Sequence, residues 1–129
     1  IMNSITKAID SRLIKSCHDL SEGGLAVAAA EMAFSGGYGI ELFLKKVSRS
    51  KNVMRNDHVL FSESNSRFLV EVSEKRREDF EASMKNVDYA VIGKTQNDTR
   101  FLVYGLDDEV VIDTGIDKLR QAWRSTLEG

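Results

Sequence analysis

The spacing of apolar residues along the chain predicts an alternation of helices and strands. Apolar residues recur at helical intervals over residues 5–13, 25–34, 74–84 and 116–127. The second of these stretches is apolar on nearly all sides except at Glu31, which predicts a buried helix. Apolar and polar residues alternate as in strands, or form short β-rich runs, over residues 14–17, 40–44, 68–72, 89–95, 101–104 and 109–113. Residues 46–60 lack a clear period and predict a loop or a short helix.

The order of these segments indicates the fold class. Helix, strand, helix and strand are followed by β-rich runs separated by the turn-rich breaks 96–99 and 106–108, which predict hairpins. Thr114 precedes the last helix as its expected N-cap. We therefore expect residues 1–129 to form a single α+β domain, with helices packed on a mixed β-sheet.

Composition and charge narrow the class of protein. The 129 residues are 42% hydrophobic and 29% charged, which is typical of a folded domain. The net charge of −2 disfavours a general nucleic-acid binder, and no apolar run reaches the length of about 18 residues that a membrane span needs. Neither a secretory leader nor a second cysteine beside Cys17 is present, so we expect a reducing, cytoplasmic location. Because the chain begins Ile1-Met2, without an initiator methionine, we expect either an expression scar or a domain cut from a longer protein.

The first candidate for chemistry is the polar turn that leads into the apolar helix. His18 and Asp19 end a predicted strand, Ser21 follows, and Gly23-Gly24 opens the helix. Unpaired amides at a helix start attract anions, and glycines let a ligand approach the backbone. The same residues also fit a purely structural role, in which Ser21 or Asp19 caps the helix and the glycines permit close packing against a strand. Glu22 counts against phosphate, since its charge repels one.

Cys17 and His18 raise two further hypotheses. Adjacent strand residues point to opposite sides, so one metal ion rarely binds both. The sequence therefore disfavours a metal site here, with His58 the only other histidine. The same geometry excludes His18 as a base for a Cys17 nucleophile, although His58 could approach Cys17 in the fold.

The second candidate is the polar loop 61–67. It holds three hydroxyls, a carboxylate, an amide and a guanidinium, a set that suits a polyhydroxylated or phosphorylated ligand. Glu63 could accept from hydroxyls or hold Mg²⁺, and Arg67 could bind phosphate through its two-pronged guanidinium. In the structural alternative, Glu63 simply pairs with Arg67.

Three other segments favour structural roles. The acid-free stretch 45–55 carries five cations but lies in an acidic chain, so a solvated loop is expected. The glycines of 36–39 follow a helix rather than precede one and therefore predict a cap and turn. Trp123, on the apolar face of the last helix, is expected in the core.

Taken together, two of these motifs carry a resemblance to a known family. HDLSEGGLAVA at 18–28 and LFSESNSRF at 60–68, supported by Ile92-Gly93-Lys94 and by a last helix with Leu119 and Trp123, resemble the C-terminal domain of the synthetase subunit of phosphoribosylformylglycinamidine synthase. The resemblance covers residues 13–127. The wider superfamily, that of aminoimidazole ribonucleotide synthetase, shares the glycine turn, whereas Ser62-Glu63-Ser64 with Arg67 favours the purine enzyme.

The resemblance implies a function for a larger protein. That family of purine-biosynthesis ligases converts formylglycinamide ribonucleotide, ATP and glutamine-derived ammonia into formylglycinamidine ribonucleotide, ADP and phosphate. It implies ATP and Mg²⁺ as cofactors of the full-length enzyme, held mostly by N-terminal domains, with none bound tightly by this domain alone. It implies as partners those N-terminal domains, a glutaminase subunit or domain, and a like domain in a dimer. We expect the isolated domain to be inactive.

By motif match, the resemblance assigns no catalytic residue and no metal ligand to this chain. It assigns one wall of a nucleotide or substrate cleft to His18, Asp19, Ser21, Gly23, Gly24, Ser62, Glu63, Ser64 and Arg67. Two alternatives remain open at this point: another ATP-using member of the superfamily, such as an aminoimidazole ribonucleotide synthetase-like enzyme, and a non-catalytic module for dimerisation or docking.

Overall fold

A computed structural model describes residues 7–21, 23–47, 55–61, 67–85 and 87–128, of which 57, 58 and 123–128 are described by their backbone only. The chain enters in a helical turn at residues 7–10. The labelled helices are α2 (Gly24–Gly36), α3 (Asn56–Phe61), α4 (Arg77–Ser83) and α5 (Ile116–Glu128), with 3₁₀ turns η1 (Leu44–Lys46) and η2 (Glu74–Arg76). The strands are β1 (Ser16–Asp19), β2 (Gly39–Phe43), β3 (Phe68–Glu71), β4 (Gly93–Gln96), β5 (Arg100–Tyr104) and β6 (Val110–Gly115).

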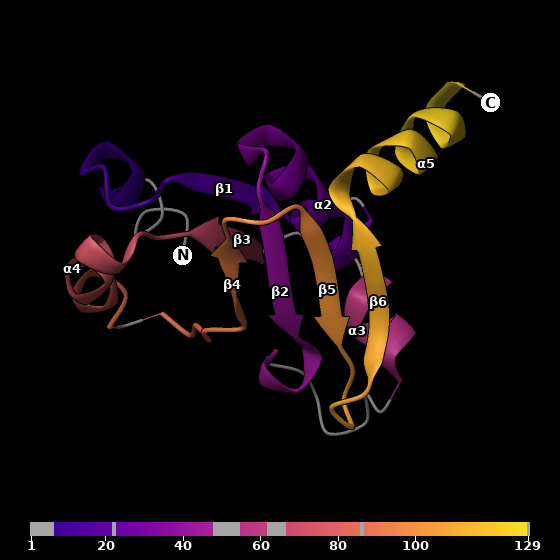
Figure 1. The fold of residues 1–129 in the computed structure, drawn as a ribbon. Coiled ribbons are helices and arrows are strands. Elements are labelled where there is room, and N and C mark those ends of the chain that lie inside the picture. The colour runs from indigo at the N-terminus through magenta and orange to yellow at the C-terminus, as the bar shows by residue number, and fades with distance from the viewer. Residues whose placement is uncertain (1–6, 22, 48–54, 62–66, 86, 129) are drawn as a thin grey trace.

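These strands form two sheets. The larger has the order β4-β2-β5-β6, in which β2 and β5 are parallel and the other pairs antiparallel. The smaller is the antiparallel pair β1–β3. Figure 1 shows α2 and α3 behind the larger sheet, α4 beyond β3, and α5 running away from the end of β6. The predicted α+β class with a mixed sheet is confirmed.

The main core lies between α2 and the larger sheet. The helix is rich in alanine, and Ala29 and Ala33 are completely buried, which lets its backbone approach the strands closely. From the sheet, Phe101 and Val103 of β5 are also almost fully buried against it. A smaller cluster of Ala8, Phe80 and Met84 packs on the other side of the β1–β3 pair. No described helix is both long enough and apolar enough to span a bilayer.

The predicted hairpin at 96–99 is wrong, because β2 lies between β4 and β5. The loop between these two strands instead passes over the start of β2, where the Gly39 amide donates to the Asp98 carbonyl at 2.6 Å. A Cβ on Gly39 would lie 2.6 Å from the carbonyl oxygen of Arg100, so only glycine allows this close approach. The second predicted hairpin, between β5 and β6, is confirmed.

Several element boundaries also differ from the prediction. Strand pairing of the segment 89–95 begins only near residue 92, where the Ile92 carbonyl accepts from the Phe43 amide at 2.8 Å. Thr114 lies inside β6 rather than at the helix cap, and the first amide of α5, that of Ile116, donates to the Thr99 carbonyl at 2.8 Å. The side chain of Trp123 is outside the described part of the structure, so its predicted core position stays a prediction.

The expected cap and turn after the second predicted helix is confirmed. Gly37 has φ of 70°, and its amide donates to the Ala33 carbonyl at 2.8 Å, which closes the last turn of α2. Tyr38 follows, and its hydroxyl donates to the Glu71 carboxylate of β3. This bond joins the start of β2 in the larger sheet to the smaller sheet.

Candidate functional site

The β1–β3 pair brings the two predicted motifs to the same place. In its register Asp19 lies opposite Phe68, and the Leu20 amide donates to the Arg67 carbonyl at 3.0 Å. Arg67, at the end of the second motif, is therefore adjacent to the turn of the first. Ser62, Glu63 and Ser64 lie outside the described residues, so their predicted place in the cleft stays a prediction.

A cleft opens beside the end of β1. Its volume is about 440 Å³, and it is lined by Cys17, His18, Asp19, Ser21 and Glu31. Three of these residues, His18, Asp19 and Ser21, belong to the predicted site. His18 and Asp19 are the last two residues of β1, and Ser21 lies in the turn that follows. Glu31 reaches the cleft from α2.

Asp19 is held by the residue two places further on. Its Oδ1 accepts from the Ser21 hydroxyl at 2.7 Å and from the Ser21 amide at 3.2 Å, a local turn typical of aspartate. These hydrogen bonds, together with the nearby His18, lower the pKa of Asp19 below its ordinary value of 3.8. Asp19 is therefore an anion at neutral pH and an acceptor of hydrogen bonds.

His18 faces a carboxylate on the neighbouring helix. Its Nδ1 lies 3.5 Å from Oε2 of Glu31, and only 20% of the His18 side chain is exposed, against 49% for Glu31. The carboxylate favours a ring orientation in which Nε2 remains available for another partner. Sequence reasoning did not include Glu31 in the site. The signal was present, since it is the one charged position in an otherwise apolar helix.

Cys17 lines the cleft but has the properties of a structural thiol. Burial first, and the Asp19 charge second, raise the pKa of Cys17 above its ordinary value of 9.0, so it remains protonated. The side chain of His58, its hypothetical base, is outside the described part of the chain. Among the residues that are described, no three His, Cys, Asp or Glu side chains lie together as metal ligands would.

Gly23 and Gly24 form the sharp entry into α2. Their φ angles are 78° and 71°, in the left-handed region that favours glycine. Gly23 is the N-cap residue of α2, so neither Asp19 nor Ser21 occupies the cap position that the structural alternative gave them. A Cβ on Gly23 would lie 2.8 Å from Cβ of Val27 on α2 itself, so a side chain at this position would crowd the first turns of the helix.

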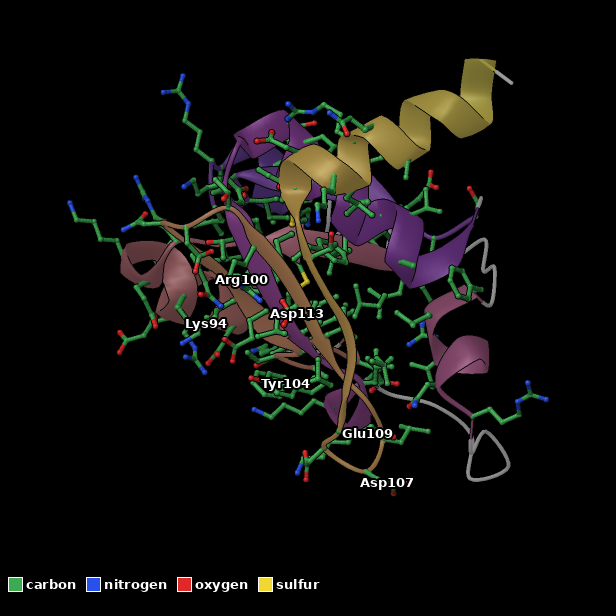
Figure 2. All side chains as sticks on the ribbon, turned by 45° about the vertical axis from the view of Figure 1, so that its right-hand side comes forward. Lys94, Arg100, Tyr104, Asp107, Glu109 and Asp113 are labelled. Atoms are coloured by element: carbon green, nitrogen blue, oxygen red, sulfur yellow. The ribbon has the colours of Figure 1, made fainter. Side chains whose placement is uncertain are left out.

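A second hollow, of about 320 Å³, lies where β5 begins and β6 ends. Its lining residues are Thr99, Arg100, Asp113, Thr114, Gly115, Asp117 and Lys118. Arg100 and Asp113 meet across β5 and β6 in an ion pair, as their labelled positions in Figure 2 show. Because these charges neutralise one another, this hollow carries no functional assignment. In the basic stretch 45–55, Lys45 pairs with Asp108 at 2.9 Å, and residues 48–54 are not among those described.

Comparison with known proteins shows which sequences this chain is similar to. The chain is 36% identical over 124 residues to a protein from Thermococcus sibiricus named phosphoribosylformylglycinamidine synthase subunit PurL, and 34% identical over 131 residues to one of the same name from Alkaliphilus metalliredigens. The matches cover 96% and 99% of this chain but only 17% and 16% of those proteins. This chain therefore spans a small part of the curated relatives' length.

Solved structures show the same fold. Thermotoga maritima PurL, in its complex with FGAR, has a TM-score of 0.78 at 22% identity, over 92% of this chain and 20% of that one. Escherichia coli HypE, a hydrogenase maturation protein, has a TM-score of 0.71 at 20% identity, over 88% of this chain and 38% of that one. The family model described as AIR synthase related protein, C-terminal domain, matches residues 2–105. The chain belongs to this family of AIR synthase related C-terminal domains.

Proposed function

We propose that this chain is the C-terminal domain of the synthetase subunit of a phosphoribosylformylglycinamidine synthase, a cytoplasmic enzyme. The observation that carries the proposal is the match to two PurL subunits over nearly the whole chain, at 36% and 34% identity. The whole enzyme would join formylglycinamide ribonucleotide, ATP and ammonia to give the amidine, ADP and phosphate. The domain of 129 residues would supply one wall of a cleft and not the complete reaction site.

The geometry supports a binding role rather than a chemical step for this wall. His18, Asp19 and Ser21 present hydrogen-bonding groups to a cleft, and Arg67 lies next to the same turn. Cys17, the only sulfur nucleophile, has a raised pKa and stays protonated. The proposed site also includes Gly23, Gly24, Ser62, Glu63 and Ser64, as the motif match implies.

ATP and Mg²⁺ belong, in this proposal, to the other domains of the subunit. Thermotoga maritima PurL has been solved in complexes with ATP and ADP. The family resemblance implies that the N-terminal domains hold most of the ATP and Mg²⁺ contacts, and we place Mg²⁺ and the reacting phosphates there. Remaining proposed partners are a glutaminase that delivers ammonia and a like domain in a pseudo-symmetric pair; a structure named PurLQS from the same organism is among the fold neighbours.

A domain exchange tests the proposal. The equivalent segment of Thermococcus sibiricus PurL is replaced with this chain, and a control chimera receives the segment of Alkaliphilus metalliredigens PurL. We expect both chimeras to form the amidine from formylglycinamide ribonucleotide, ATP and ammonium chloride, and this chain alone to form none. An active control beside a folded but inactive chimera carrying this chain would refute the assignment and favour another superfamily member or a docking module. Turnover by the isolated chain would refute the incomplete-site part.

A further inference from the structure

The side chains that line the 440 Å³ cleft determine what kind of ligand it accepts. Two of the five, Asp19 and Glu31, are carboxylates, and none of the lining residues is Lys or Arg among those the structure describes. A phosphate placed here would be repelled by both carboxylates and would meet no lysine or arginine among the described lining residues. The cleft therefore disfavours the phosphate that the sequence motif led us to expect.

Hydroxyl groups suit the same lining. Oδ1 of Asp19 already accepts twice from Ser21, and Oδ2 has no hydrogen-bond partner among the described residues. A carboxylate that is fixed in this way and faces a cleft is the group with which proteins often bind ribose hydroxyls. His18, whose Nδ1 lies 3.5 Å from Oε2 of Glu31, also lines the cleft and adds a second hydrogen-bonding group.

The glycine turn lies outside this lining. Gly23 and Gly24 open α2 but do not border the cleft, and Arg67 sits at the neighbouring strand end. The groups suited to anions, namely the glycine turn and Arg67, are thus separate from the cleft lining that suits hydroxyls. This separation matches a ribonucleotide, which carries its hydroxyls and its phosphate on different atoms of one sugar.

We infer that the cleft between β1 and α2 binds the hydroxyl groups of a ribose, with Asp19 as their acceptor, and does not bind phosphate. This inference rests on the proposed function, since it takes the ligand to be a ribonucleotide. Formylglycinamide ribonucleotide and ATP both contain the ribose, and the experiment separates them.

The test compares ribonucleotides with their 2′-deoxy analogues by calorimetry, using the full-length protein that carries this chain. One arm uses formylglycinamide ribonucleotide and its 2′-deoxy form, and the other uses ATP and 2′-deoxy-ATP. We expect the protein to bind one ribo form about tenfold more tightly than its deoxy form, and Asp19→Asn to reduce that ratio to less than about threefold. Asp88→Asn removes the same negative charge at an exposed position outside the cleft, and it should leave the ratio unaltered.

Two outcomes would overturn the inference: an equal ribo-to-deoxy ratio in the parent protein and in Asp19→Asn, or a loss of inorganic phosphate binding on that substitution. Glu31→Gln provides a second variant if Asp19→Asn does not fold, and we expect it to lower the same ratio. Amidine formation is measured on the same proteins. If Asp19→Asn still forms the amidine and its ribo-to-deoxy affinity ratio is unchanged, the ribose site is refuted and the proposed function stands. If the domain-exchange chimera forms no amidine, the proposed function itself is refuted.

Discussion

The two sheets of this domain use their strands differently. In the larger sheet one face is covered by helices, so that Phe101, Val103 and Leu42 are 2%, 0% and 3% exposed. The opposite face carries Lys94, Arg100 and Tyr104, which lie in Figure 2 on the side away from α2 and α3. In the β1–β3 pair most side chains are only half-buried, and one strand ends in the cleft.

This difference separates stability from binding within one small domain. Burial of apolar surface concentrates at the larger sheet, and hydrogen-bonding groups concentrate where the smaller pair ends. A short strand pair between two cores is anchored on both faces, yet its end remains open to solvent. We therefore expect substitutions in the larger sheet to affect folding, and substitutions at the end of β1 to affect ligand binding.

The largest expected effect compares one phenylalanine from each sheet. Phe101→Ala removes a ring that is 2% exposed and should lower the free energy of unfolding by about 3–5 kcal/mol, because it leaves a cavity in the main core. Phe68→Ala, in the half-buried strand β3, should cost about 1–2 kcal/mol. Urea denaturation monitored by circular dichroism measures both. Equal losses in the two variants would contradict the division between the sheets.

The sequence pattern predicted most elements of the larger sheet but not its strand order. The alternation in 40–44 and the short β-rich run 101–104 are local signals, which the sequence pattern reveals directly. The insertion of β2 between β4 and β5 depends on Gly39, whose lack of a side chain admits the loop at Asp98. Such a contact joins residues far apart in the chain, and nothing in the local pattern of either segment records it.

The candidate site divides in the same way. His18, Asp19 and Ser21 are close in sequence, and a polar turn before a glycine pair was sufficient to identify them. Glu31 is conspicuous in the sequence as the one charged position of an apolar helix, but its contact with His18 requires α2 to fold back along β1, a tertiary arrangement that the spacing alone does not specify. The preference for hydroxyls over phosphate also depends on Glu31, so the ligand class could not be predicted without the fold.

A smaller effect is expected at the bond that connects the sheets. Burial, and then the hydrogen bond to Glu71, raise the pKa of Tyr38 above its ordinary value of 10.0. Tyr38→Phe removes the donor to a buried carboxylate and should lower the free energy of unfolding by about 1–2 kcal/mol. Because the raised pKa belongs to the folded state, this stabilisation is fully present below pH 10 and is lost as the pH rises further.

Tyr104→Phe is the matched control for Tyr38→Phe. Its ring stacks on Phe43 at 5.1 Å on the open face of the larger sheet, and no hydrogen bond of its hydroxyl is found among the described residues. Thermal unfolding at neutral pH should therefore show little change for Tyr104→Phe and a clear loss for Tyr38→Phe. The same small change in both variants would mean that the bond between Tyr38 and Glu71 does not hold the two sheets together.

The smallest expected effect concerns the end of β1 itself. Ser21→Ala removes the 2.7 Å hydrogen bond from the hydroxyl to Oδ1 of Asp19, so the pKa of Asp19 should rise toward 3.8. Because the pKa of Asp19 is lowered in the folded state, its carboxylate stabilises the fold at any pH above the ordinary pKa of 3.8. This stabilisation is lost as the pH falls through the lowered pKa. Carbon-detected NMR titration of the Asp19 carboxyl measures the shift, and Ser83→Ala, whose hydroxyl donates to the Phe80 carbonyl on α4, is the control. Because Asp19 is fully exposed, thermal stability at neutral pH should barely change; a large loss of stability would show that this turn supports the fold rather than a ligand.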